Sequence, residues 1–195
     1  MKNYLIFVFT LATISNSLGQ DIIEWNQTYK LERSDFLART GESTSGVFTV
    51  HAACAINFFY QMSSYEFMLT KNFNSKVSTT FNRPASYILA PDSITGARLL
   101  RFAQAEFDLA ELYARKFRKS MFDNKKAFSD PGFYQRLYDS IQKEHTVHVS
   151  QLSQNTEIGM AENRLNEQHQ QIIADIESLS DYCKSCKPKK KKKEI

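Results

Sequence analysis

The sequence lacks several features that would assign it to a special class of protein. It has only three cysteines in 195 residues, so at least one thiol stays unpaired within the chain. No internal repeat is visible. No segment after residue 19 approaches the roughly 18 consecutive apolar residues of a membrane-spanning helix. The composition, 42% hydrophobic and 24% charged, is that of one globular domain with its own core.

The folded body also lacks an excess of positive charge. The net charge is +4, but seven lysines and one glutamate lie in residues 184–195. Without these residues and Lys2, the 25 basic and 21 acidic residues become 17 and 20. No cluster of basic residues marks a nucleic-acid interface, so we expect no nucleic-acid partner.

The first 19 residues are typical of a secretory signal peptide. Lys2 precedes the apolar run from Tyr4 to Ile14, and Ser17-Leu18-Gly19 forms a small-residue cleavage site before Gln20. No cysteine follows directly, which argues against a lipid anchor. The sequence therefore predicts an exported protein, periplasmic or extracellular, with one domain over residues 20–182.

The first half of that domain has the composition of strands. Residues 21–35 predict a short strand and a turn, with Trp25 and Leu31 in the core. The apolar run VFTVHAACAINFFY, residues 47–60, predicts one long buried strand. Residues 66–81 predict two more strands, the second with alternating inward residues from Phe73 to Phe81.

The second half predicts three helices. Residues 99–122 have apolar residues at helical spacing and no Gly or Pro, and Asp92, Ser93 or Thr95 can cap this helix. Asp130-Pro131 starts a second helix that runs to about Gln154. The third covers residues 161–181, and its predicted inner face consists of Leu165, Ile172, Ile173, Ile176 and Leu179. Strands followed by helices indicate an α+β fold, with antiparallel strands packed on three C-terminal helices.

The order of several short motifs resembles a known family. The motifs are Ile23-x-Trp25, Leu31, Asp35-Phe36, Ser86-Tyr87, Leu99-Leu100 and the block FDLAELYAR from Phe107 to Arg115. Together they resemble a bacterial domain of unknown function described as a predicted secreted zinc-dependent protease. The resemblance covers residues 23–179 and implies a zincin-like fold.

The chain departs from that family where the metal ligands stand. The family's His-Glu-Gln-Gly-His is replaced by Phe102-Ala103-Gln104-Ala105-Glu106. In a second family element, whose histidine is a plausible further ligand, Thr156 and Gly159 are kept but Ile158 takes the histidine position. Zinc sites need imidazole, thiolate or carboxylate donors, and catalytic sites use three of them. The resemblance therefore implies a degenerate member with no zinc cofactor and no catalytic residues.

Two interpretations of Glu106 stay open. It lines a vestigial cleft and binds a cation or the amine of a partner, or it is partly exposed and paired with Arg98, Arg101 or a lysine. Glu111 and Arg115 are four residues apart on the predicted helix and predict a structural ion pair. An active metallopeptidase with relocated ligands is the alternative, and its ligands would be Glu106, Glu111, His145 and His148.

The cysteines predict little chemistry. His51 and Cys54 lie three apart on a predicted strand, hence on opposite faces, so they cannot pair directly. Cys54 is predicted to be a small buried apolar side chain. The Cys183-x-x-Cys186 motif follows a helix C-terminus, which favours a local or structural disulfide over a redox enzyme, with pairing to Cys54 left open.

The C-terminal tail is low in complexity and strongly basic. Lys187 and Lys189 to Lys193 suggest an anionic surface as a partner, because each lysine near such a surface contributes about 1 kcal/mol. A simple solvated terminus is the other interpretation. The sequence thus leaves three functions open: a non-catalytic binding or structural module with an unknown protein partner, a relocated metallopeptidase, and a surface-adhesion protein.

Overall fold

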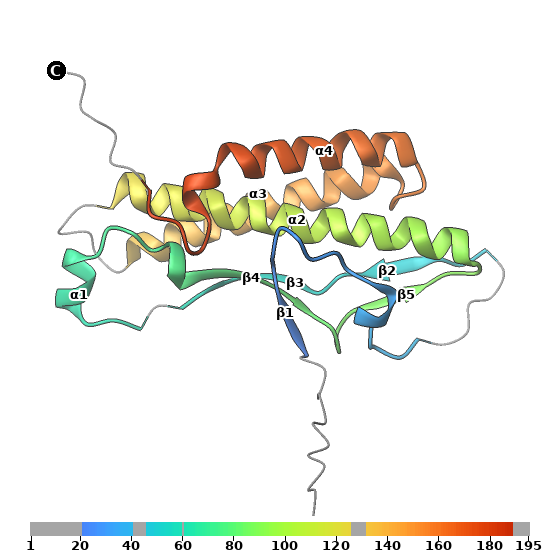
Figure 1. Cartoon of the computed structure of the whole chain (residues 1–195), viewed down its shortest axis with the longest axis horizontal. Helices are drawn as coiled ribbons and strands as arrows, with labels where there is room; N and C mark the ends of the chain where they lie inside the picture. The colour runs from blue at the N-terminus through green and yellow to red at the C-terminus, as the bar shows by residue number, and fades with distance from the viewer. Residues whose placement is uncertain (1–20, 41–45, 60, 126–131, 189–195) are drawn as a thin grey trace, which may run out of the picture.

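The computed structural model describes residues 21–40, 46–59, 61–125 and 132–188, and it has an α+β fold. Three long helices form one layer: α2 (Ser93–Asn124), α3 (Gly132–Thr156) and α4 (Glu162–Ser178). Short antiparallel strands form the second layer (Figure 1). Helix α2 contacts α3 and α4 on one side and the strands on the other. It is the centre of the fold, as its apolar pattern predicted.

The strands form two separate antiparallel sheets. The first has the order β1-β4-β3, with β1 (Ile22–Glu24), β4 (Val77–Asn82) and β3 (Cys54–Phe58). The second pairs β2 (Thr49–His51) with β5 (Tyr87–Leu89). The prediction of strand near residue 21 is confirmed, and Leu31 is buried at 5% exposure.

The prediction of one strand over residues 47–60 is wrong. The chain forms a γ-turn centred on Ala53, because the Ala52 carbonyl accepts a hydrogen bond from the Cys54 amide at 2.8 Å, the i to i+2 pattern. The Ser86 hydroxyl accepts from the Ala53 amide at 2.9 Å and donates to the Asn82 carbonyl at 2.7 Å. This turn sends β2 and β3 into different sheets.

The prediction of two strands over residues 66–81 is half wrong. The first part is a short helix, α1 (Ser64–Leu69), which begins where the Ser63 hydroxyl accepts from the Glu66 amide. A 3₁₀ turn over Asn74–Lys76 follows, so the real strand β4 starts at Val77 rather than at Phe73. Six residues are too few for helical periodicity to stand out from a strand pattern.

The helix predictions are confirmed for the described residues. Asp92 is the N-cap of α2 and accepts from the Thr95 amide at 2.8 Å. Helix α4 turns its predicted inner face to the core, with Leu165, Ile172 and Ile176 each 2% exposed. The Asp130-Pro131 start of α3 and the signal-peptide region lie outside the described residues. None of the described helices is long and apolar enough to span a lipid bilayer.

Candidate functional site

The turn of α2 that would hold zinc in the resembling family is part of the hydrophobic core. Phe102 is 3% exposed and belongs to the main core cluster with Leu109 and Leu165. Ala103 is fully buried in a second cluster with Leu31 and Phe81. Neither side chain carries an atom that can bind a metal, so these positions do not fit a zinc ion.

The link between α3 and α4 packs against the same turn. Glu157, Ile158 and Gly159 have φ values of 52°, 53° and 87°, so the chain reverses through left-handed backbone. Ile158 packs against the core cluster that contains Phe102. A Cβ atom on Gly159 would meet the Phe102 Cβ at 2.9 Å. The two segments that would carry metal ligands are thus neighbours, and their side chains at those positions are apolar.

Glu106, one turn after Phe102, points away from this core into a pocket of about 260 Å³. The pocket lies between the β2–β3 turn, α2 and α3, and His51, Cys54 and His145 line it together with Glu106. Burial raises the pKa of the Glu106 carboxyl to about 8. A carboxylic acid that stays protonated near neutral pH in a pocket marks a candidate functional site.

His51 and Cys54 line the same pocket, so the prediction that they lie on opposite faces is wrong, although no hydrogen bond joins them among the described residues. The γ-turn centred on Ala53 interrupts the strand between them and so changes the alternation of faces. Cys54 is a free thiol and is only partly buried. Burial, with the Glu106 and Asp108 carboxylates, raises the pKa of this thiol well above its usual value, so the thiol is neutral at pH 7.

The predicted partners of Glu106 bind elsewhere. Arg98 and Arg101 both pair with Glu162 at the start of α4, at 2.5 and 3.0 Å. Within the part of the chain that the structure describes, Glu106 itself has no hydrogen bond or ion pair. Glu106 is partly exposed, as one interpretation predicted, but its predicted pairing with Arg98 or Arg101 is wrong, because both arginines pair with Glu162.

The four residues of the relocated-ligand alternative are not gathered. His145 lines the Glu106 pocket, whereas His148 lies 3.3 Å from the Tyr113 hydroxyl and lines a different hollow. Glu111 is held in a buried ion-pair network on another face of α2. Among the described residues, no three His, Cys, Asp or Glu side chains are placed to hold a metal ion.

His145 is the pocket residue whose role the sequence did not reveal. Burial, with a smaller effect of His148, lowers the pKa of its imidazole to about 4, so the ring is neutral at pH 7. Its Nε2 atom is buried and has no hydrogen-bond partner among the described residues. The relocated-ligand alternative made His145 and His148 ligands of one metal, but only His145 lines the pocket of Glu106.

A second polar group on α2 fixes the N-terminal segment and α4. Asp108 accepts hydrogen bonds from the Trp25 indole at 2.7 Å and from Gln104 at 3.0 Å, and it lies 2.7 Å from His169 Nε2. Gln104 in turn accepts from the Leu31 amide at 2.8 Å. Although burial opposes ionisation, the hydrogen bonds from His169, Gln104 and Trp25 hold the pKa of Asp108 below its usual value. His169 was missed because its neighbours in α4 give no pattern that distinguishes it.

The predicted ion pair of Glu111 and Arg115 is confirmed at 3.0 Å and is part of a larger network. Glu111 also binds Arg118 at 2.8 Å and accepts from the Thr79 hydroxyl at 2.8 Å. Arg115 donates to the Ile176 carbonyl, and Arg118 donates to carbonyls of β4 and of the C-terminal segment. Because these groups pair with one another, the FDLAELYAR block serves to join α2, β4 and α4.

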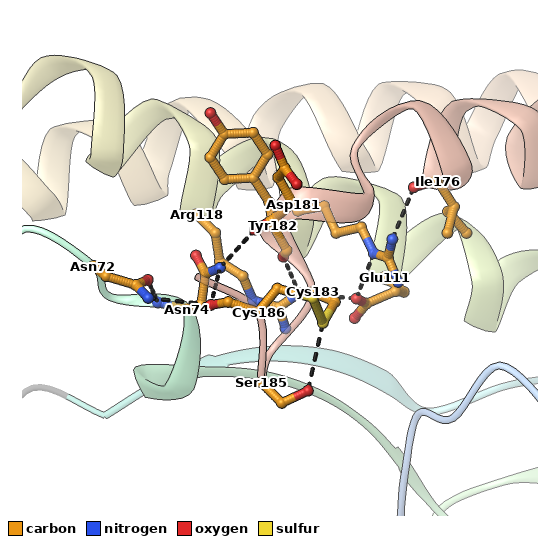
Figure 2. The surroundings of a disulfide bond; sticks show 11 residues. Asn72, Asn74, Glu111, Arg118, Ile176, Asp181, Tyr182, Cys183, Ser185 and Cys186 are labelled. Carbon is orange, nitrogen blue, oxygen red and sulfur yellow. Dashed lines mark hydrogen bonds and ion pairs between the residues drawn. A yellow bond between two sulfur atoms is a disulfide. The ribbon is translucent and has the colours of Figure 1, made fainter. Parts of the chain in front are cut away.

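The predicted local disulfide is confirmed, and Figure 2 shows its surroundings. Cys183 and Cys186 are bonded just after the 3₁₀ turn Ser180–Tyr182. Side-chain amides of Asn72 and Asn74 donate to the Cys186 carbonyl at 3.1 and 3.0 Å. The motif thus secures the C-terminal segment against the β-layer, which is a structural role.

The polybasic tail is described only at its start. Lys187 is exposed, while Lys189 to Lys193 lie outside the described residues. An anionic surface as a partner stays a prediction.

Comparisons with known proteins give no family assignment. No family model matches the chain, no curated protein is significantly similar to it, and no solved structure matches its fold. Any function must therefore be argued from the residues themselves.

Proposed function

We propose that this protein is an exported, non-catalytic binding module derived from a zincin-like scaffold, and that the Glu106 pocket is its binding site. The observation that carries the proposal is the contact between Phe102 and the Ile158–Gly159 link. Two segments that would carry metal ligands in the resembling family meet here, and they meet as hydrophobic core. In this proposal the protein retains a zincin-like fold, and apolar residues that pack in the core occupy the positions of the metal ligands.

The polar networks of α2 support the same proposal. Asp108, Glu111 and Arg115, from the part of the chain that most resembles the family, are buried at 2%, 3% and 5% exposure and bind other protein groups. Side chains that are already paired within the core serve stability. Glu106 differs because it has no partner among the described residues and faces a pocket, which is what a binding residue requires.

The relocated metallopeptidase is the weaker alternative. It needs Glu111 as a ligand, but this carboxylate already accepts from Arg115, Arg118 and Thr79. Withdrawing Glu111 would leave two buried guanidinium groups without their counter-ion, at a cost of about 3 to 5 kcal/mol. Metal binding by Glu111 would therefore require loss of a buried ion-pair network, which disfavours this alternative.

Metal analysis of the purified protein tests the proposal. After dialysis we expect far less than one zinc per chain, and no hydrolysis of casein that a chelator abolishes. About one tightly bound zinc per chain together with chelator-sensitive cleavage would overturn the proposal. The double variant His145→Ala, His148→Ala is the matched control, since loss of such zinc in this variant would point to the relocated site.

A further inference from the structure

The Glu106 pocket contains an uncompensated acidic group, and this limits what it can bind. The carboxyl has no hydrogen-bond or ion-pair partner among the described residues. The groups that face it are His51 of β2, Cys54 of β3 and His145 of α3. No lysine or arginine of the described chain lines the pocket. A ligand that brings positive charge would therefore meet a free acceptor and no competing cation.

We propose that this pocket binds a primary ammonium group carried on a short alkyl chain, with the Glu106 carboxylate as its counter-ion. The inference rests on the proposed role of the pocket as the binding site. A primary ammonium has three hydrogen-bond donors and no acceptor, which suits a pocket lined by a carboxyl group that has no partner among the described residues.

The walls of the pocket suit the alkyl chain. Val50 and Ala52 line one side and Val149 of α3 lines another, so methylene groups would contact apolar side chains. Burial of methylene groups against such side chains favours binding. An alkyl anion of the same size would be repelled by ionised Glu106, and a neutral alcohol could donate only one hydrogen bond to it, without the attraction between opposite charges. Charge therefore favours the ammonium over both.

Proton linkage gives the inference a distinctive signature. Burial raises the pKa of Glu106 to about 8, so the ammonium binds the minority ionised form at pH 6 and displaces a proton. The affinity should rise about tenfold per pH unit from pH 6 to 7 and level off above pH 8. The pKa of His145 is lowered to about 4 and the Cys54 thiol is neutral, so neither group titrates in this range. His51 is exposed at the rim, and the variant His51→Gln tests its contribution.

Isothermal titration calorimetry of the purified protein tests the inference with three probes of equal length: n-butylamine, n-butanol and butyrate. We expect n-butylamine to bind at least about tenfold more tightly than either of the others at pH 8. Glu106→Gln should lose this preference, while Glu144→Gln, which changes an exposed glutamate of α3, should keep it. The thermal melt of each variant shows whether it is folded.

Three results would contradict the ammonium-binding inference. Equal binding of n-butanol, no binding of n-butylamine at millimolar concentration, or an affinity independent of pH and of Glu106 would overturn the inference. Nα-acetyl-lysine N-methylamide is the second amine probe. If it binds like n-butylamine, the ammonium can belong to a lysine of a partner, and if only n-butylamine binds, the ligand is a free amine. The zinc analysis is independent of all these titrations, so failure of the amine inference is distinguishable from failure of the proposed function.

Discussion

Gly159 lies so close to Phe102 that a Cβ atom at Gly159 would stand 2.9 Å from the Phe102 Cβ and equally close to the Arg98 carbonyl oxygen. Its φ of +87° also belongs to the backbone region that side chains disfavour. Helix α2 and the α3–α4 link can approach this closely only because the residue is glycine.

We therefore expect Gly159→Ala to destabilise the fold by about 3 kcal/mol, the sum of backbone strain and a forced shift of α2. Gly46 is the matched control, because it has the same φ of +87° but no atom within 4 Å of the position that a Cβ would take. Gly46→Ala should therefore cost only about 1 kcal/mol. Urea unfolding measures both. Equal costs would show that the close approach to Phe102 does not constrain the fold.

Glu106 should make stability depend on pH in the direction opposite to an ordinary acid. Its folded pKa of about 8 lies above the unfolded value of 4.5, so the unfolded state loses its proton first as the pH rises. The contribution of Glu106 to the free energy of unfolding is therefore most favourable below pH 4.5, and it decreases progressively as the pH rises to 8. Glu106→Gln should be more stable than the wild type at pH 8, by roughly 2 to 4 kcal/mol, and nearly equal at about pH 4.5.

Denaturant unfolding across that pH range measures the effect, and Glu144→Gln serves as the exposed control. A constant difference between wild type and Glu106→Gln from pH 4.5 to 8 would mean that the carboxyl is ionised in the folded protein. Carbon NMR of the Glu106 carboxyl measures its titration directly.

Asp108 should behave in the opposite way. Hydrogen bonds from His169, Gln104 and Trp25 outweigh burial and keep its folded pKa below the unfolded value of 3.8. Its stabilising contribution is complete above pH 3.8 and is lost as the pH falls through the lower folded pKa. Asp108→Asn should cost about 2 to 4 kcal/mol at about pH 7 and less in acid, because it removes the charge that His169 and Trp25 bind.

Asp123 provides the control for this variant, since it forms an exposed pair with Lys119 at 2.5 Å. Asp123→Asn should change the free energy of unfolding by less than about 1 kcal/mol. Similar losses for Asp108→Asn and Asp123→Asn would rule out a special role of the buried network.

The disulfide should matter less than the asparagines that hold the same segment. Cys183 and Cys186 close a very short loop, so replacing both with serine should cost at most about 2 kcal/mol. Asn74 is 1% exposed and donates to the carbonyls of Asp181 and Cys186. Asn74→Ala should raise amide hydrogen exchange over residues 179–187 more than the double serine variant does. The reverse order would make the disulfide the main attachment of the segment.

The sequence predicted the parts of the fold that depend on local patterns. The cap at Asp92 and the inner face of α4 follow from residues within one or two turns, and both are confirmed. The strand over residues 47–60 failed because its interruption depends on Ser86, more than thirty residues away. Apolar composition alone cannot show a turn that a distant hydroxyl stabilises.

The candidate site was predicted only in part, because most of its residues come together through contacts between distant parts of the chain. Glu106 stood out because it keeps a donor atom at the turn where the resembling family has its ligands, and one of its two interpretations placed it in a cleft; in the structure it lines a pocket. Its neighbours His51, Cys54 and His145 come from three other elements, and only tertiary packing brings them together. The preference of Arg98 and Arg101 for Glu162 is a long-range contact that spacing on one helix cannot reveal.

The γ-turn centred on Ala53 has a consequence for how this protein can change over evolutionary time. Ser86 is fully buried, lines no part of the pocket, and holds the turn through the Ala53 amide. Loss of this single hydroxyl would leave the Ala53 amide without its acceptor, and straightening of the β2–β3 junction would turn His51 to the face opposite Cys54. A substitution at a residue outside the pocket lining would then change the pocket by moving His51, without replacing any residue that lines it.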